Sequence, residues 1–252
     1  MDLDKLEEIG LDPLKDALKK FHGWPVLEAE HEKWDASKFD WIELLYEFRA
    51  NGYSSDLFFD FSIGTDLKNS SWRTISFDQP GLGLSREYLI KGLKEENVQH
   101  YFTFMQKVAI LMGADPAKAK QDLEQVLNFE IKLAQASLPR EERRNAFALY
   151  HPMTLDDLYH LVPLLNWTEY VNKMLPAKLD RVNSGERVIV YGPDYLKKLV
   201  DILATEPKQN VANYMMWKVA VSTLGFMNEE ARNIIDDYAK ALSGKKDKTP
   251  RY

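Results

Sequence analysis

The histidines are the residues best suited to metal-assisted hydrolysis, and there are five of them: His22, His31, His100, His151 and His160. A hydrolytic zinc site on a helix needs two imidazoles four positions apart, so that both nitrogens lie on one side. The segment His31-Glu32-Lys33-Trp34-Asp35 begins in this way but ends in an aspartate, and it is short and polar. His151 and His160 lie nine positions apart across a proline, with no third ligand in pattern. We therefore expect no metal site in this chain, and surface or packing roles for these histidines.

Carboxylates and glycines are the next candidates for chemistry. Among 39 Asp and Glu residues, a pair such as Asp156-Asp157 is expected to supply first-turn helix charges, not an acid/base pair. Glu130 falls near the apolar stripe of its helix, so its carboxylate is expected to be buried. Such a carboxylate has either a functional role or a structural one as the partner of a core arginine, and the structural role is the favoured hypothesis. The run Gly81-Leu82-Gly83-Leu84 lacks the spacing of a phosphate-binding loop, and no G-x-S-x-G occurs. We predict no catalytic residue.

Two sequons are the remaining candidate sites. Asn69-Ser70-Ser71 and Asn166-Trp167-Thr168 both fit the acceptor pattern for N-linked glycans. Such triplets also arise by chance, so two of them are a mild indication of a secreted protein. The first falls at the tip of a predicted hairpin, where a glycan is tolerated. We expect glycosylation at Asn69 and at Asn166.

Composition limits the classes of partner. The 252 residues are 45% hydrophobic and 29% charged, which is typical of a globular protein with one large domain or two small ones. A net charge of -6 argues against nucleic acid or an anionic membrane as partner, since both attract a basic face. No run approaches the roughly 18 apolar residues of a membrane helix. We also expect no targeting signal within these residues. The absence of cysteine excludes disulfides and thiolate sites within these residues.

The elements that would position such residues are mainly helices. Apolar residues recur at helical spacing over most of the chain, with caps at Asp115-Pro116, Thr154 and Asn228. This pattern predicts helices within 2–21, 39–50, 101–112, 116–138, 154–161, 193–203, 209–226 and 228–242, the last two as an antiparallel pair. Strand signals are confined to 57–63 and 72–77, which form a predicted β-hairpin, and to a further extended segment over 187–191.

We therefore predict a mainly α fold, a multi-helix domain with a small β-hairpin around residues 57–77. No linker divides the chain, so residues 1–252 are expected to form a single domain. The alternative prediction is that the chain forms two helical sub-lobes, which the 57–77 hairpin connects.

Several runs resemble the neprilysin and endothelin-converting-enzyme family of zinc metalloendopeptidases. The most specific are Asp66-Leu67-Lys68-Asn69-Ser70 and Asp78-Gln79-Pro80-Gly81-Leu82-Gly83-Leu84-Ser85-Arg86, and further matches follow in order at 143–155, 188–196, 213–217 and 249–252. The sequence departs from the family in lacking a proline between Leu84 and Ser85. The ordered matches cover essentially the whole chain.

The resemblance implies that this chain is the non-catalytic lobe of such a peptidase, which caps the peptide chamber and limits substrate size. The family's zinc ligands have no counterpart in these residues, so no activity and no cofactor are expected from this chain alone, with zinc in the full-length relatives. The implied partners are the catalytic zinc domain of the parent protein and the peptides that the parent cleaves. The implied location is extracellular or secreted, with a parent of the type II membrane class as one form. The alternative is a stand-alone truncated neprilysin-like binding or decoy protein.

Overall fold

The computed structural model describes residues 3–28 and 34–244 and contains, over these residues, eleven α-helices and four β-strands. The mainly α prediction with a small β part is confirmed. The chain groups into two compact units. Unit 1 comprises residues 1–41, 83–131 and 207–252, and unit 2 comprises 42–82 and 132–206. Each unit is described by itself, and the single-domain expectation stays a prediction.

Unit 1 is helical. It contains α1 (Leu3–Ile9), α2 (Asp12–Lys20), α4 (Arg86–Leu89), α5 (Glu96–Leu111), the first part of α6 (Pro116–Ala136), α10 (Lys208–Thr223) and α11 (Glu229–Ser243). Its core is rich in aromatic side chains: the indole of Trp217 packs edge-on against Tyr101 at 6.0 Å and Phe104 at 5.3 Å. Nine residues of α10 are buried, so this helix is apolar around most of its circumference and lies at the centre of the unit.

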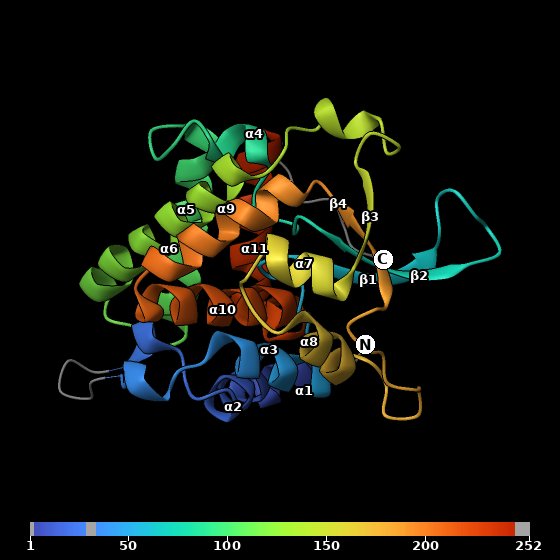
Figure 1. The fold of residues 1–252 in the computed structure, drawn as a ribbon. Helices are drawn as coiled ribbons and strands as arrows, with labels where there is room; N and C mark the ends of the chain where they lie inside the picture. Colours follow the sequence, from blue (N-terminus) through green and yellow to red (C-terminus); the bar gives the residue numbers. More distant parts are fainter. Residues whose placement is uncertain (1–2, 29–33, 245–252) are drawn as a thin grey trace. The chain divides into compact units, whose positions relative to one another are not determined.

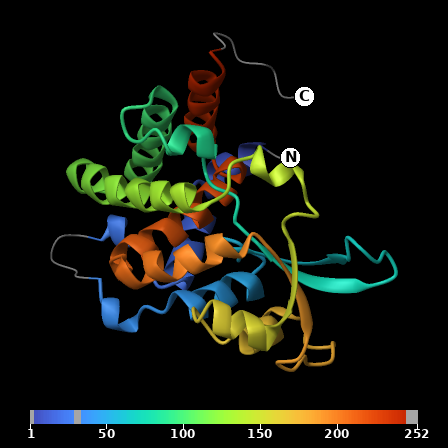
Figure 2. The same ribbon diagram turned by 45° about the horizontal axis from the view of Figure 1, so that its top comes forward.

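The prediction that the last two helices pack against each other as an antiparallel pair is wrong. Helix α11 packs mainly along α5, not along α10, and the ring of Tyr238 stacks on Phe104 with the centroids 4.5 Å apart. Figures 1 and 2 both show α11 beside α5. Helix α10 is buried around most of its circumference by other elements of the unit. The single apolar face of α11 therefore packs on a different helix.

Unit 2 is built on a four-stranded sheet. Its strands are β1 (Asp60–Thr65), β2 (Arg73–Asp78), β3 (Tyr150–Thr154) and β4 (Arg187–Tyr191), in the order β1-β2-β4-β3. Strands β1 and β2 form the predicted antiparallel hairpin, β4 pairs parallel to β2, and β3 pairs antiparallel to β4. The helices of this unit are α3 (Trp41–Ala50), the end of α6, α7 (Leu155–Leu161), α8 (Trp167–Met174) and α9 (Pro193–Thr205). The loop between β1 and β2 projects beyond the sheet (Figure 1).

An aromatic cluster joins the sheet to α8. Phe59 and Phe77 pack on Trp167 at 5.2 Å and 5.0 Å, and Tyr170 lies 5.1 Å from Phe59. All four side chains are buried. Edge-to-face contacts of this kind add to the free energy gained by burying apolar area. The cluster holds both the start of the hairpin and the N-terminus of α8 in place.

Candidate functional site

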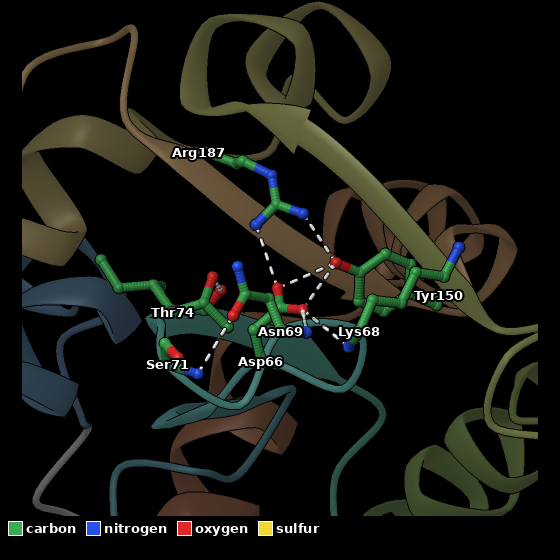
Figure 3. A network of polar contacts seen from close by, with 8 residues as sticks. Asp66, Lys68, Asn69, Ser71, Thr74, Tyr150 and Arg187 are labelled. Carbon is green, nitrogen blue, oxygen red and sulfur yellow. Dashed lines mark hydrogen bonds and ion pairs between the residues drawn. The ribbon is translucent and has the colours of Figure 1, made fainter.

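The most connected polar group is Asp66, at the end of β1. Its Oδ1 accepts hydrogen bonds from the backbone N–H groups of Lys68 at 2.8 Å and Asn69 at 3.0 Å. Its Oδ2 accepts from the Tyr150 hydroxyl at 2.8 Å and from Nη1 of Arg187 at 3.0 Å. Nη2 of Arg187 also donates to the Tyr150 oxygen at 2.6 Å, which closes a ring of three side chains (Figure 3). Only 1% of the Asp66 side chain is exposed.

The electrostatics of Asp66 favour an ionised carboxylate with a structural role. Burial alone would raise the pKa of this carboxyl, but the hydrogen bonds from Tyr150, Arg187, Lys68 and Asn69 outweigh it and lower the pKa to about 2. The hydrogen bond to Asp66 raises the pKa of Arg187 in turn. An ionised carboxylate that accepts hydrogen bonds from two backbone N–H groups and two side chains is suited to anchoring the loop.

The anchored loop carries the first sequon. Oδ1 of Asn69 accepts from the backbone N–H of Ser71 at 3.1 Å, and the Asn69 side chain is half-buried. Trp72 closes the loop by donating its N–H to the Asn69 carbonyl at 2.9 Å, and its ring lies 5.4 Å from the Arg187 guanidinium. Sequence reasoning missed the roles of Tyr150 and Arg187, because they reach Asp66 only through the pairing of β3 and β4.

The second sequon begins a helix. Asn166 is the N-cap of α8, and its Oδ1 accepts from the backbone N–H of Glu169 at 3.0 Å. The side chain is exposed at the wall of a groove of about 440 Å³ that is lined by Leu155, Asp156, Tyr159, Pro163, Leu164, Leu165, Asn166, Trp167, Thr168 and Ser184. Whether either sequon carries a glycan stays a prediction.

Glu130 is fully buried, as its position on the apolar stripe suggests. The hypothesis that its partner is a core arginine is wrong. The Oε1 atom accepts from the backbone N–H of Gly83 at 2.7 Å and lies 4.0 Å from Nζ of Lys218. The Tyr101 hydroxyl lies close by and accepts from Nε1 of Trp217 at 2.8 Å. Burial and the neighbouring carboxylate raise the pKa of Tyr101. The structure provides a lysine and a backbone amide where an arginine was expected.

This cluster explains the second glycine of the Gly81-Leu82-Gly83-Leu84 run. A Cβ atom on Gly83 would lie 2.0 Å from the Tyr101 oxygen and 3.2 Å from Oε1 of Glu130. Only a glycine lets the backbone approach the buried pair so closely. No atom lies within 4 Å of the corresponding position on Gly81.

The described residues do not fit a metal centre. Over residues 3–28 and 34–244, no three His, Asp or Glu side chains are placed to hold a metal ion. His151 and His160 are exposed, and each ring nitrogen Nδ1 lies within hydrogen-bond distance of a nearby backbone carbonyl. His31 and Glu32 lie outside the described residues. Over the same ranges, no helix is long and apolar enough to cross a membrane.

A family model for peptidase family M13 matches residues 1–252. The chain belongs to this family. Neprilysin-2 of Drosophila melanogaster is 38% identical over 248 residues, which cover 98% of this chain and 32% of the relative. The human membrane metallo-endopeptidase-like 1 is 32% identical, over 97% of this chain and 32% of the relative. The neprilysin resemblance is confirmed, and the chain spans about a third of the length of these M13 relatives.

Solved M13 structures share the fold. The open state of Mycobacterium tuberculosis zinc metalloprotease Zmp1 superposes with a TM-score of 0.79 and 18% identity, over 99% of this chain and 36% of that one. PepO from Lactobacillus rhamnosis gives a TM-score of 0.74 at 14% identity. At this identity the likeness shows the fold alone. The chain therefore corresponds to the N-terminal region of neprilysin-like metallopeptidases.

Proposed function

We propose that this chain is the non-catalytic lobe of a neprilysin-like zinc metalloendopeptidase, and that it caps the peptide chamber and limits substrate size. The observation that supports it most is that one family model matches the whole chain, while the chain spans about a third of its relatives. Most of a neprilysin-like protein thus lies outside the part that this chain matches. The catalytic zinc domain would be the chain's main partner, and peptides would be the substrates of the pair.

Zinc is expected in the other part of such a protein. The described residues offer no ligand set for it, so no step of peptide hydrolysis is assigned to this chain. Within each unit the core is closely packed, and in unit 2 the β1–β2 loop is anchored through Asp66, so we expect each unit by itself to resist deformation. A rigid wall is what a size limit requires, because a deformable one would admit larger substrates.

An exchange of lobes tests the proposal. The matched region of Drosophila neprilysin-2 is replaced by this chain, and kcat/KM is measured on unstructured substrates from short peptides to a whole unfolded protein. We expect the exchange to keep cleavage of short peptides and to keep the long chain excluded, while deletion of the region abolishes the exclusion. Equal rates on the short peptide and the unfolded protein would contradict a size-limiting role.

The alternative is a stand-alone binding or decoy protein of the same family. It predicts that the chain alone binds neprilysin substrates, or a partner, without a zinc domain present. Calorimetry of the purified chain with a peptide substrate, alone and with a separately produced zinc domain, separates the two. Binding that needs the zinc domain supports the lobe.

The extracellular location is part of the same proposal, and it makes glycosylation at Asn69 and Asn166 the expected modification. Peptide mapping of a secreted form, after removal of glycans by an amidase, should show conversion of both asparagines to aspartate. Unmodified asparagine at both positions in secreted, folded protein would contradict this part of the proposal.

A further inference from the structure

The groove beside Asn166 has the features of a carbohydrate subsite. We propose that it holds the first N-acetylglucosamine of a glycan attached to Asn166, and that this sugar stabilises unit 2. The inference rests on the extracellular location proposed above. Its volume of about 440 Å³ falls in the range of small-ligand pockets, roughly 300–1,000 Å³.

The attachment point is part of the wall of the groove. Asn166 and Thr168, the two sequon residues that the reaction requires, both line it. Because Oδ1 of Asn166 is held by the backbone N–H of Glu169, the side chain is restrained and Nδ2 is the atom left to carry the sugar. Attachment joins Nδ2 to the anomeric carbon of a lipid-diphosphate-linked oligosaccharide; the lipid diphosphate leaves with the electrons of the broken C–O bond, and Nδ2 loses a proton.

The lining contains both the apolar and the polar groups that a pyranose ring contacts. Tyr159 is 50% exposed and, with Leu164, provides an apolar surface for the C–H face of the sugar. Asp156 and Ser184 line the same groove and offer polar groups for hydroxyl and acetamido substituents. Tyr159 is a large aromatic side chain that is half-exposed in the groove where the sequon lies. Its exposure has a function if the sugar packs on its ring.

The other sequon serves as the internal control. Asn69 lies in the projecting loop between β1 and β2, and its neighbours Lys68, Ser70 and Ser71 are exposed. That loop is anchored by Asp66 without any sugar. A glycan on Asn69 is therefore expected to leave the melting temperature unchanged.

The test uses the full 252-residue chain, secreted from cells that make only high-mannose glycans, with occupancy first measured by mass spectrometry. An endoglycosidase leaves one N-acetylglucosamine on each asparagine. An amidase, applied to a second sample of the intact glycoprotein, removes the whole glycan and converts each asparagine to aspartate. Aspartate at position 166 still caps α8, and the charge that it adds is the same in the Tyr159 variants below, so their comparison isolates the contact between the sugar and the groove. We expect the endoglycosidase product to keep the melting temperature of the intact glycoprotein, and the amidase product to lose about 2–4 °C.

Variants assign the effect to the groove. In Tyr159→Ala the difference in melting temperature between the endoglycosidase product and the amidase product should disappear. In Tyr159→Phe this difference should be kept, because phenylalanine retains the aromatic ring. Phe147→Ala, which removes an aromatic side chain of 61% exposure elsewhere in unit 2, should leave the difference intact. Asn69→Gln should also leave it intact.

Two results would overturn the inference in distinguishable ways. Occupied Asn166 with equal melting temperatures for the two digested forms refutes the subsite and leaves the glycosylation standing. Unoccupied Asn166 in secreted, folded chain refutes both. Neither result bears on the size-limiting role, which the lobe exchange tests separately.

Discussion

Replacement of Gly83 by alanine is the sharpest test of the packing around Glu130. The added methyl carbon would lie 2.0 Å from the hydroxyl oxygen and 2.8 Å from Cζ of Tyr101. Tyr101 cannot turn aside freely, since it is 1% exposed and packs against the rings of Trp217 and Tyr238, each 6.0 Å away. Either this ring or the backbone at Gly83 must move.

The magnitude follows from the contacts that such a movement disturbs. Overpacking of a filled core costs about 1–3 kcal/mol. Displacing the Tyr101 oxygen also takes the acceptor from Nε1 of Trp217, and a buried donor without a partner costs about 1–3 kcal/mol. Alanine lowers the conformational entropy of the unfolded chain relative to glycine, which stabilises the folded state by about 0.4–1 kcal/mol. We expect a net loss of about 2–4 kcal/mol in the free energy of unfolding.

Urea denaturation followed by tryptophan fluorescence measures the effect, and Gly81→Ala is the matched control. With an m-value of about 3 kcal/mol/M, Gly83→Ala should lower the midpoint by roughly 1 M. Gly81→Ala meets no atom within 4 Å, so it should leave the midpoint unchanged or raise it slightly. The double variant Gly83→Ala/Tyr101→Phe removes the atom at 2.0 Å and should be less destabilised than the sum of its parts. Equal midpoints for the two alanine variants, or strict additivity, would refute the reasoning.

Three further outcomes are expected. Because the pKa of Asp66 is lowered to about 2 in the folded chain, its stabilising effect is complete above pH 3.8 and is lost as the pH falls from there towards 2. Hydrogen-exchange protection of the Lys68 and Asn69 amides should follow this course, and in Asp66→Asn it should be weak at every pH. Burial, then the charges of Asp56 and Asp78, raise the pKa of Asp60, so folding favours its neutral form. The resulting loss of stability grows as the pH rises from 3.8 to the folded pKa and is constant above it. Asp60→Asn should therefore raise the melting temperature at pH 7, by no more than about 3 °C for a partly exposed group, with no gain at pH 3. The purified chain, rinsed with chelator, should contain no stoichiometric zinc by elemental analysis and cleave no peptide; one tightly held zinc per chain would contradict the absence of a ligand set.

The features that the sequence predicts well are those fixed by neighbouring residues. Asp115 caps α6 through the N–H groups of Ala117 and Lys118, and Thr154 forms the predicted capping box with Asp157. Asn228 caps α11 by accepting from Ala231. Each of these interactions spans three residues or fewer, so its pattern is visible in the sequence.

The features that the sequence does not predict depend on distant partners. Strand β3, Tyr150–Thr154, contains a proline and lacks alternating apolar residues, and it becomes a strand only by pairing with β4 at the edge of the sheet. The burial of Glu130 follows from its helix periodicity, whereas Lys218 and Gly83 reach it from other segments. The sequon pattern predicts a glycan at Asn166, which stays a prediction, whereas the role of Asn166 as the N-cap of α8 is not predicted.

The parallel pairing of β2 with β4 has a consequence for biosynthesis. Ile75 pairs opposite Val188, so the two strands are about 110 residues apart in the chain, and the second is synthesised long after the first. Until β4 has left the ribosome, β2 presents an unpaired edge, which is a common starting point for aggregation. The nascent hairpin therefore waits in an incomplete state while more than a hundred residues are added. A chaperone that covers this edge, or a glycan added early at the hairpin tip, would protect the chain during that interval.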